Sequence, residues 1–205
     1  MSDVEMVWSD PATEVHRLVV GPVDNNVYVV RCRRTGEALL VDAANEPERL
    51  VGVARDLGVT NVVTTHGHWD HIQAVTAARD EGLVVWVHAG DADQLSGYDH
   101  LIADGDELSA GDVRVRALHT PGHTPGSVTY ELVGAPVLFT GDTLFPGGPG
   151  ATHFDSGDFA TIITSIEQRI FGAFGDEATI WPGHGAPSTL GVERPHLAEW
   201  VERGW

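Results

Sequence analysis

Residues 64–71 read Thr-Thr-His-Gly-His-Trp-Asp-His, which places three histidines and one aspartate within six residues. The run that leads into them, 61–65, is rich in β-branched residues and predicts a short buried strand. Gly67 permits a tight turn at the end of this strand, so His66 and His68 can point into one cavity. Imidazole and carboxylate groups are the usual ligands of zinc, iron and manganese. The stretch therefore predicts a metal site at the end of a strand.

The next residues extend the same site onto a helix. The apolar spacing over 72–79 predicts this helix, and Asp70 and His71 lie in its first turn. The positive end of the helix dipole helps to keep Asp70 ionised. A single histidine is more often a core or surface residue, but four ligand-type side chains at this spacing favour a metal site.

Length and composition are those of an ordinary globular protein. The chain has 205 residues, 42% hydrophobic and 20% charged, and we expect residues 1–205 to form one domain around a substantial core. No apolar run approaches the roughly 18 residues of a membrane span, and the acidic N-terminus is unlike a signal peptide. We therefore expect a cytoplasmic protein without a membrane partner. Cys32 is the only cysteine, and its strand-like surroundings favour a packing role over a metal ligand.

The charge balance bears on the kind of partner. The formal net charge of −18 comes from 30 acidic and 12 basic side chains. Such a chain repels polyanions, and its largest basic cluster, Arg31, Arg33 and Arg34, is typical of a solvated hairpin end. We expect no nucleic-acid partner.

Apolar runs predict the rest of the framework. Further strands are expected at 14–20, 26–30, 37–42, 83–88, 113–118, 127–133, 136–140 and 178–181. Further helices are expected at 47–57, 158–171 and 195–201. The order strand, helix, strand between residues 61 and 88 implies a parallel crossover, so we expect α/β layers.

Three more candidate ligands follow predicted strands. A Pro-Gly pair at 121–122 forces a turn that places His123 at the end of a strand, the same architectural position as that of His66. Asp142 also lies at a strand terminus, although an isolated Gly-Asp-Thr is as often structural as functional. His184 lies in a Pro-Gly-His-Gly turn after the last predicted strand.

Together these motifs resemble the signature of the metallo-β-lactamase superfamily, which includes glyoxalase II, ribonuclease Z-type nucleases and persulfide dioxygenases. The resemblance rests on a strand-ending aspartate at Asp42, His-x-His-x-Asp-His over 66–71, Thr-Pro-Gly-His over 120–123, Gly-Asp-Thr over 141–143 and Pro-Gly-His-Gly over 182–185. Five motifs in family order are far more specific than any one of them. The resemblance implies an α/β fold, a four-layer αββα sandwich, with the site at one edge between two sheets.

The resemblance also implies a role for each ligand. The implied ligands are His66, His68 and His123 for the first metal, Asp70, His71 and His184 for the second, and Asp142 between the two metals. Asp42 is expected to support a ligand through a hydrogen bond. Two divalent ions are implied, with zinc favoured over iron or manganese, although spacing alone leaves the metal open.

Two such metals would share a water whose pKa falls toward about 7, and the bridging hydroxide would attack a carbonyl. The candidate catalytic residues are Asp142 and Asp70, the latter as a proton acceptor. Because the ligand set contains only two carboxylates, the centre would keep a net positive charge and favour an anionic group on the substrate.

Within the superfamily, residues 141–158 and 182–194 resemble compact glyoxalase II-like (hydroxyacylglutathione hydrolase-like) enzymes. Full-length glyoxalase II hydrolyses S-lactoylglutathione and binds the glutathione through a C-terminal helical domain, for which this chain is too short. We therefore expect hydrolysis of a small anionic thioester, S-lactoylglutathione-like or on another thiol carrier. The sequence leaves the oligomeric state open.

One segment departs from the family pattern. Relatives usually carry Gly-Arg-x-Asp-Phe where this chain reads Gly-Ala-Thr-His-Phe, at 150–154. The preceding loop, 146–150, is expected to border the pocket and to alter substrate preference, whereas His153 is expected to be exposed. His88 and His119 are expected to be packed, and His196 to lie at the surface.

Two alternatives remain open. A persulfide dioxygenase keeps the same motifs but binds one iron through the equivalents of His66, His123 and Asp142, and oxidises a thiol persulfide with O₂. The fuller resemblance of the C-terminal segment favours the hydrolase. A non-enzymatic metal-binding or partner-binding domain is disfavoured by the complete ligand set, and a secreted β-lactamase by the acidic N-terminus.

Overall fold

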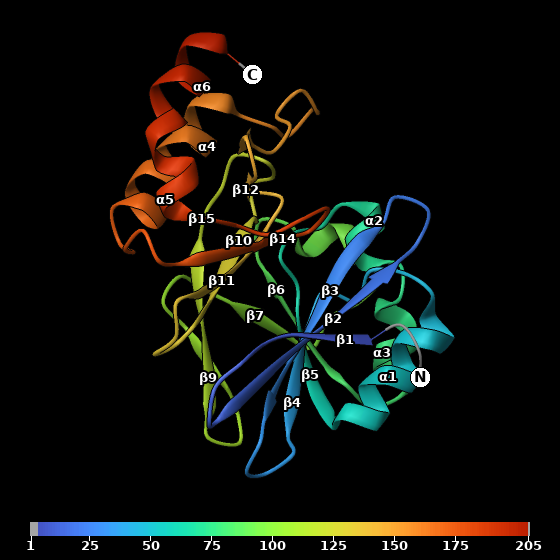
Figure 1. Ribbon diagram of the computed structural model, residues 1–205. Coiled ribbons are helices and arrows are strands. Elements are labelled where there is room, and N and C mark those ends of the chain that lie inside the picture. Colours follow the sequence, from blue (N-terminus) through green and yellow to red (C-terminus); the bar gives the residue numbers. More distant parts are fainter. Residues whose placement is uncertain (1–3, 205) are drawn as a thin grey trace.

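The computed structural model describes residues 4–204, and its centre is a pair of β-sheets (Figure 1). The first sheet has seven strands in the order β1 (Val4–Ser9), β2 (Thr13–Val20), β3 (Asn25–Cys32), β4 (Ala38–Val41), β5 (Val59–Val63), β6 (Val84–His88) and β7 (His100–Ile102). The pairs from β1 to β4 are antiparallel, and the pairs from β4 to β7 are parallel. The parallel crossover expected around β5 is therefore present.

The second sheet has six strands and is mostly antiparallel. Their order is β15 (Ser188–Thr189), β14 (Thr179–Pro182), β11 (Val137–Gly141), β10 (Val128–Leu132), β9 (Val113–His119) and β8 (Glu107–Ala110). Only the β11–β14 pair in this sheet is parallel. A two-stranded ribbon, β12 (Leu144–Phe145) with β13 (Gly148–Pro149), follows β11.

Helices cover both outer faces, as Figure 1 shows. Those beside the first sheet are α1 (Pro47–Leu57), α2 (Trp69–Ile72), α3 (Val75–Asp80) and the single 3₁₀ turn η1 (Ala92–Gln94). Those beside the second sheet are α4 (Phe159–Ser165), the π-helical η2 (Ile166–Phe171), α5 (Leu190–Glu193), the 3₁₀ turn η3 (Arg194–His196) and α6 (Leu197–Arg203). Helix α1 has proline in its first turn and ends at Gly58, whose φ of 76° is easy only for glycine.

Three hydrophobic clusters fill the spaces between the layers. The first packs α1 and α3 on the first sheet and contains Leu50 and Val85. The second lies between the two sheets and contains Val63 and Phe139. The third joins the second sheet to the C-terminal helices and contains the buried Trp200. Three interfaces separate four layers, which confirms the predicted αββα sandwich.

The helix predicted over 72–79 is interrupted. The backbone N–H groups of Gln73 and Ala74 donate to the carbonyls of Ala44 and Ala43, at 2.9 and 3.0 Å, instead of to the preceding turn. The loop after β4 thus divides the segment into α2 and α3. Local periodicity cannot predict this division, because the competing acceptors come from a distant part of the chain.

The helix predicted over 158–171 changes its winding part of the way along. It starts as α4 and continues as the π-helical η2, where Gly172 donates its N–H to the carbonyl of Glu167 at 2.9 Å. The wider turn keeps both Ile170 and Phe171 buried.

Strands β1 and β7 were not predicted, and the exposure of Met6 and Leu101 explains their weak apolar signal.

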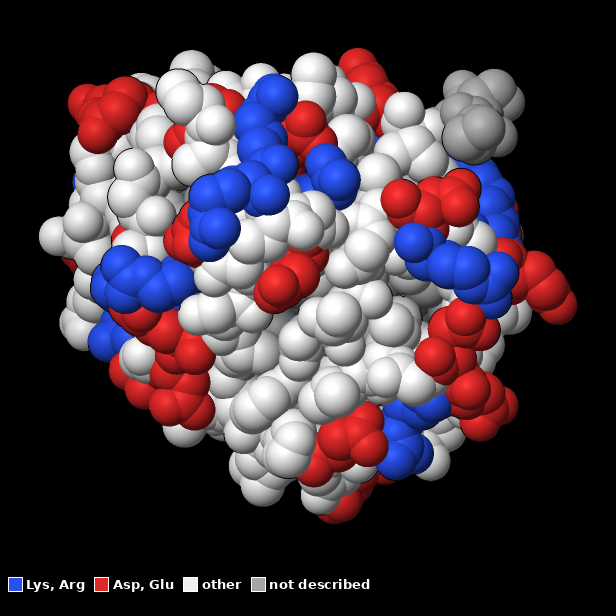
Figure 2. Space-filling view, turned by 90° about the horizontal axis from the view of Figure 1, so that it is seen from below, with Lys and Arg blue, Asp and Glu red and all other residues white. Residues whose placement is uncertain are grey.

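The arginine cluster predicted at a hairpin end is neutralised by carboxylates. Arg31 and Arg33 both ion-pair with Glu14, and Arg34 pairs with Asp112. On the face in Figure 2, basic side chains lie directly beside acidic ones, and a broad area between them carries neither kind.

Two more expectations concern Cys32 and membranes. The thiol of Cys32 is buried in the cluster between the sheets, which agrees with a packing role. No helix in the described part of the chain combines the length and apolar character needed to cross a bilayer.

The loop between β9 and β10 is held from outside by α4. The hydroxyl of Ser165 donates to the carbonyl of Pro121 at 2.7 Å. Gly122 passes so close to the helix that a Cβ at this position would lie 2.3 Å from the backbone nitrogen of Ile162. Only glycine allows this approach, so the helix fixes the path of the loop that carries His123.

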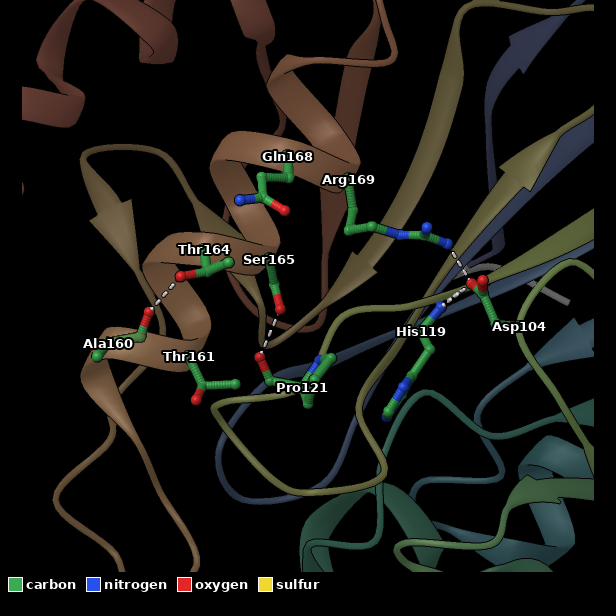
Figure 3. Close-up of a pocket in the computed structure, with 9 residues that line it drawn as sticks. All are labelled: Asp104, His119, Pro121, Ala160, Thr161, Thr164, Ser165, Gln168 and Arg169. Carbon is green, nitrogen blue, oxygen red and sulfur yellow. Dashed lines mark hydrogen bonds and ion pairs between the residues drawn. The ribbon is translucent and has the colours of Figure 1, made fainter.

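A cavity of about 460 Å³ lies beside this contact (Figure 3), and none of the candidate metal ligands is among the residues that line it. His119 lines the cavity and stacks on the ring of His88 at 4.0 Å. The carboxylate of Asp104 accepts a hydrogen bond from the backbone N–H of His119 and forms an ion pair with Arg169. His88 and His119 are therefore packed structural residues, as predicted.

We expect Phe139→Ala to destabilise the sandwich, because Phe139 is fully buried between the sheets and contacts Tyr28 at a ring distance of 5.2 Å. The cavity should lower the free energy of unfolding by about 3–5 kcal/mol. Val201→Ala, at a position that is 51% exposed, should change it by less than about 0.5 kcal/mol. Urea unfolding of both variants measures the difference, and equal stabilities would contradict this packing.

Candidate metal centre

The seven candidate ligands converge at one edge of the sandwich, between the two sheets. They are carried by the turn after β5 (His66 and His68), by α2 (Asp70 and His71), by the β9–β10 loop (His123), and by the segments after β11 (Asp142) and β14 (His184). Strand ends from both sheets thus supply side chains to one place. The fold brings together all the residues that the motifs singled out.

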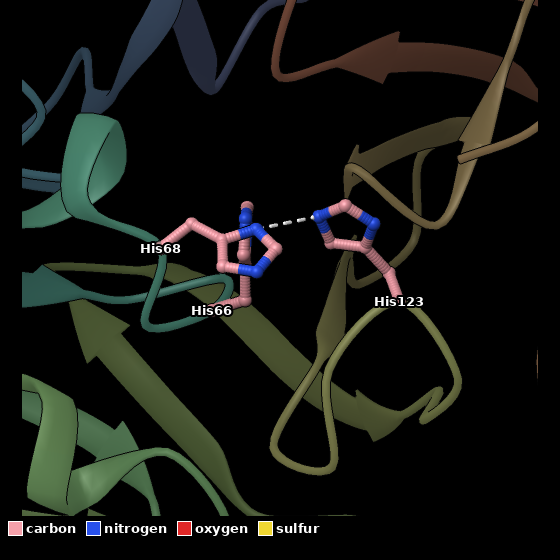
Figure 4. Close-up of side chains that lie close together, drawn as sticks. All are labelled: His66, His68 and His123. Atoms are coloured by element: carbon pink, nitrogen blue, oxygen red, sulfur yellow. Dashed lines mark hydrogen bonds between the residues drawn. The ribbon is translucent and has the colours of Figure 1, made fainter. Parts of the chain in front are cut away.

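Three histidines form the first group. In the group His66, His68 and His123, the ligand atoms lie within 4.8 Å of one another. The Nε2 atom of His123 is 2.9 Å from Nδ1 of His68, and Figure 4 shows the three rings pointing toward a common space. Three imidazoles in this arrangement leave a fourth position open for water or substrate, as catalytic zinc sites do.

The second group combines Asp70, His71 and His184, again within 4.8 Å. Oδ2 of Asp70 is 3.2 Å from Nε2 of His184 and 3.5 Å from Nε2 of His71. Asp142 forms a third group with His66 and His71. Its Oδ2 atom is 3.7 Å from Nε2 of His123 and 3.7 Å from Nε2 of His184, so Asp142 lies between the two sets of ligands.

Buried ligand atoms without hydrogen-bond partners indicate whether this cluster suits a metal. Among the described residues, Nε2 of His66 and Oδ1 of Asp142 are buried without a hydrogen-bond partner. An unsatisfied buried acceptor costs free energy that bound metal would recover. Imidazole and carboxylate donors are also those that zinc, iron and manganese accept. The donor set therefore fits a divalent metal.

Hydrogen bonds on the far side of the rings orient three of the histidines. Nδ1 of His71 is 2.8 Å from Oδ2 of Asp42, Nδ1 of His123 donates to the carbonyl of Ala151 at 2.7 Å, and Nδ1 of His184 donates to the carbonyl of Val23 at 2.9 Å. With Nδ1 engaged, Nε2 is the nitrogen that faces the cluster and that a metal would bind in place of a proton.

Asp42 supports the site as expected. Besides contacting His71, its carboxylate accepts hydrogen bonds from the backbone N–H and the hydroxyl of Thr65, both at 2.7 Å. Its φ of 65° lies in the left-handed region, which non-glycine residues rarely adopt. These buried contacts hold the backbone there, so Asp42 connects β4 to the metal-binding turn.

Two neighbouring asparagines were not predicted to take part. Asn25 donates to Oδ2 of Asp70 at 2.9 Å. Asn26 donates to the carbonyls of Pro182 and Gly185, at 3.0 and 2.9 Å, and so holds the turn that carries His184. Their sequence looks like an ordinary strand start, so only the pairing of distant segments reveals their roles.

Asp91 was also missed, although it links the two loops that carry the first group. Its carboxylate accepts hydrogen bonds from the N–H of Gly67 at 2.7 Å, the N–H of Gly126 at 2.8 Å and the hydroxyl of Thr124 at 2.6 Å. The residue is 2% exposed. It follows the end of β6, the same edge of the sheet as His66, and this position was the available signal.

Burial acts on the first group of imidazoles. It lowers the pKa of His66 well below the ordinary histidine value and also lowers the pKa of His68 and that of His123. These rings are therefore neutral at neutral pH, the form that binds a metal.

Carboxylates act on the second group. Burial opposes the charged form of His71, but Asp142 and Asp42 outweigh it and hold the pKa of His71 well above its usual value. In His184, burial is outweighed by Asp70 and Asp142, and the pKa is raised. The pKa of Asp70 is lowered although burial opposes this, because His184 and His71 stabilise the carboxylate.

The loop that departs from the family pattern borders the cluster, as predicted. Gly150 passes so close to Asp142 that a Cβ there would lie 1.8 Å from the carbonyl oxygen of Asp142. The ring of Phe154 lies 5.2 Å from that of His68. His153 is exposed, as expected, and its ring contacts that of Phe154 at 4.3 Å.

The chain belongs to the metallo-β-lactamase superfamily, whose family model matches residues 20–184. A hydroxyacylglutathione hydrolase of Rhodospirillum rubrum is 37% identical over 145 residues. This match covers 67% of the chain but 54% of that protein, so the chain spans about half of its length.

Two solved structures extend the comparison. The B3 metallo-β-lactamase BLEG-1 superposes with a TM-score of 0.78 and 31% identity, covering 89% of this chain and 97% of that one. TTHA1623, in a di-iron-bound form, gives a TM-score of 0.77 and 26% identity, covering 87% of this chain and 96% of that one. Both share the fold, and the second holds two metal ions.

We expect Asp91→Asn to weaken metal binding by the first group. The amide keeps one acceptor oxygen but turns an NH₂ group toward donors of the two loops. Removing such a support typically costs about 10–100-fold in metal affinity. Competition with a chelating dye measures it, with the exposed Asp93→Asn as the matched control. Unchanged affinity in a folded Asp91→Asn protein would contradict this role.

The two groups should differ in their sensitivity to acid, because protons compete with metals for the ligands. The second group has the raised pKa values, so it takes up protons first as the pH falls. His184→Ala, which keeps the first group, should therefore retain metal to lower pH than His68→Ala, which keeps the second. Metal content after dialysis between about pH 8 and about pH 5 tests this. The reverse order would refute it.

Proposed function

We propose that the protein is a metal-dependent hydrolase that cleaves thioesters of a small thiol, with two divalent metals, zinc being favoured over iron and manganese. The observation that carries this proposal is the convergence of seven ligand side chains into two groups, with Asp142 between them. Two such metals are characteristic of hydrolytic centres. We propose further that the enzyme is cytoplasmic and acts on a small molecule.

The comparisons support the hydrolase. The Rhodospirillum rubrum relative is named as a hydroxyacylglutathione hydrolase, and a relative from Haemophilus influenzae, 32% identical over 180 residues, carries the same name. Such a name implies a thioester between a hydroxy acid and a thiol. The TTHA1623 structure is described with two irons, which favours two metals and leaves iron as an alternative to zinc.

The proposed mechanism assigns tasks to the residues of this chain. Bound divalent metals would lower the pKa of a coordinated water toward about 7 and polarise the substrate carbonyl. His66, His68 and His123 present neutral imidazoles for the first metal. Asp70 stays ionised because its pKa is lowered, and Asn25 fixes its orientation, so Asp70 is the candidate proton acceptor during thioester cleavage.

The alternative is a dioxygenase with one iron, bound by His66, His123 and Asp142. A dioxygenase keeps the second group, Asp70, His71 and His184, as well, so the ligand set fits both reactions. The relatives named as hydroxyacylglutathione hydrolases favour the hydrolase. We therefore propose the hydrolase and keep the dioxygenase as an outcome of the experiment below.

His68→Ala should abolish hydrolysis with little loss of stability, because it removes a first-group ligand that the cores do not use. The activity should fall by at least about 100-fold. His196→Ala, at an exposed histidine outside the site, should keep full activity.

Metal analysis, thioester hydrolysis and O₂ uptake would be measured on the same preparations. About two metals per chain with thioester cleavage supports the proposal. One iron per chain with persulfide-dependent O₂ uptake would replace it with the dioxygenase, and full hydrolysis by metal-analysed His68→Ala would refute the ligand assignment.

A further inference from the structure

Four uncharged residues contact or directly neighbour metal ligands, and they come from the β2–β3 turn, α2, β12 and the loop after β13. Val23, in the turn between β2 and β3, is 43% exposed, and its carbonyl accepts the hydrogen bond from His184. Phe145 stacks near His184 at 6.5 Å, and Phe154, which is 47% exposed, lies against His68. Trp69, in α2 between two ligands, is 56% exposed. Large exposed apolar side chains around a polar centre are typical of a ligand-binding rim.

Nearly all the basic side chains of the chain form ion pairs with its own carboxylates. All 12 are arginines. Eleven of them ion-pair with carboxylates of this chain: Arg17, Arg31, Arg33, Arg34, Arg49, Arg55, Arg79, Arg114, Arg116, Arg169 and Arg194. A carboxylate on a substrate would compete with these existing partners and would approach a chain whose net charge is −18.

A metal-loaded centre would attract a negatively charged substrate less strongly than its two ligand carboxylates alone suggest. Besides the two ligand carboxylates, Asp70 and Asp142, the site contains the carboxylate of Asp42. Its Oδ2 atom is 2.8 Å from Nδ1 of His71. Three carboxylates, two of them ligands and one in contact with a ligand, would reduce the charge of two divalent ions from +4 to +1. A negative charge on the substrate therefore gains less here than a two-carboxylate centre would provide.

We propose that the thiol arm of the substrate is uncharged, and that the rim of Val23, Trp69, Phe145 and Phe154 receives it by apolar contact. This inference rests on the proposed thioester hydrolysis and specifies its substrate class. Glutathione carries two carboxylates and one ammonium group, so its thioesters have a net negative charge and are expected to be poor substrates. A neutral thiol carrier matches both the rim and the paired arginines.

Three thioesters with the same acyl group test the charge of the arm. They are S-lactoylglutathione, its N-acetylated diethyl ester, which carries no charge and is called the diethyl ester below, and the uncharged S-lactoyl-N-acetylcysteamine. With the metal-loaded protein at low salt, kcat/KM for the diethyl ester should exceed that for S-lactoylglutathione at least about fivefold. The difference should shrink as salt rises from about 10 mM to about 150 mM, because salt screens the repulsion.

A matched pair of variants tests the location. Val23→Arg places a new cation at the rim, and should raise kcat/KM for S-lactoylglutathione about two- to fivefold without improving the uncharged thioester. Val192→Arg adds the same charge on α5, at a position that is 59% exposed, and should leave both values near those of the unmodified protein.

Two failures are distinguishable. If S-lactoylglutathione is cleaved at least as well as its diethyl ester, or if its kcat/KM falls as salt rises, the uncharged arm is refuted while the hydrolase stands. If the metal-loaded protein cleaves none of the three thioesters, the proposed thioester hydrolysis is refuted, and so is the proposed substrate class.

Discussion

The structure depends on holding seven metal-ligand side chains, five imidazoles and two carboxylates, close together at one edge of the two sheets. Imidazoles and carboxylates at this edge lie within 4.8 Å of one another in each group, and the buried Nε2 of His66 and Oδ1 of Asp142 have no partner among the described residues. Burying such groups unpaired is costly, so the rest of the fold must enforce the arrangement. Two sheets, packed through a continuous apolar cluster, supply that rigidity.

Buried carboxylates that bind no metal do much of the positioning. Asp42 connects the end of β4 to the metal-binding turn through Thr65 and His71. Asp91 connects that turn, in the first sheet, to the β9–β10 loop of the second. Each carboxylate accepts backbone N–H groups that the turns would otherwise leave unpaired, so the same contact satisfies the loop and fixes the ligand.

The metal cluster indicates the class of reaction, whereas the residues around it bear on the choice of substrate. The cluster reflects a ligand set that the superfamily shares, and this set fits divalent metals. Substrate choice depends instead on the side chains around the cluster, among which Phe145 and Phe154 are aromatic and uncharged. Membership of a family therefore says more about the class of reaction than about the substrate.

The sequence by itself determined the strand–helix–strand order around residues 61–88 and the candidate ligands, because apolar periodicity and short ligand motifs are local signals. The four-layer architecture followed only from the resemblance of these motifs to the metallo-β-lactamase superfamily. Tertiary structure alone decided the roles of Asn25 and Asp91, whose partners lie 45 residues and 24 to 35 residues away along the chain. It also decided the division of the helix after Asp70 and the π-helical turn of η2. In each case a hydrogen bond from a distant or unexpected partner replaced the local one, and such a competition leaves no periodic trace in the sequence.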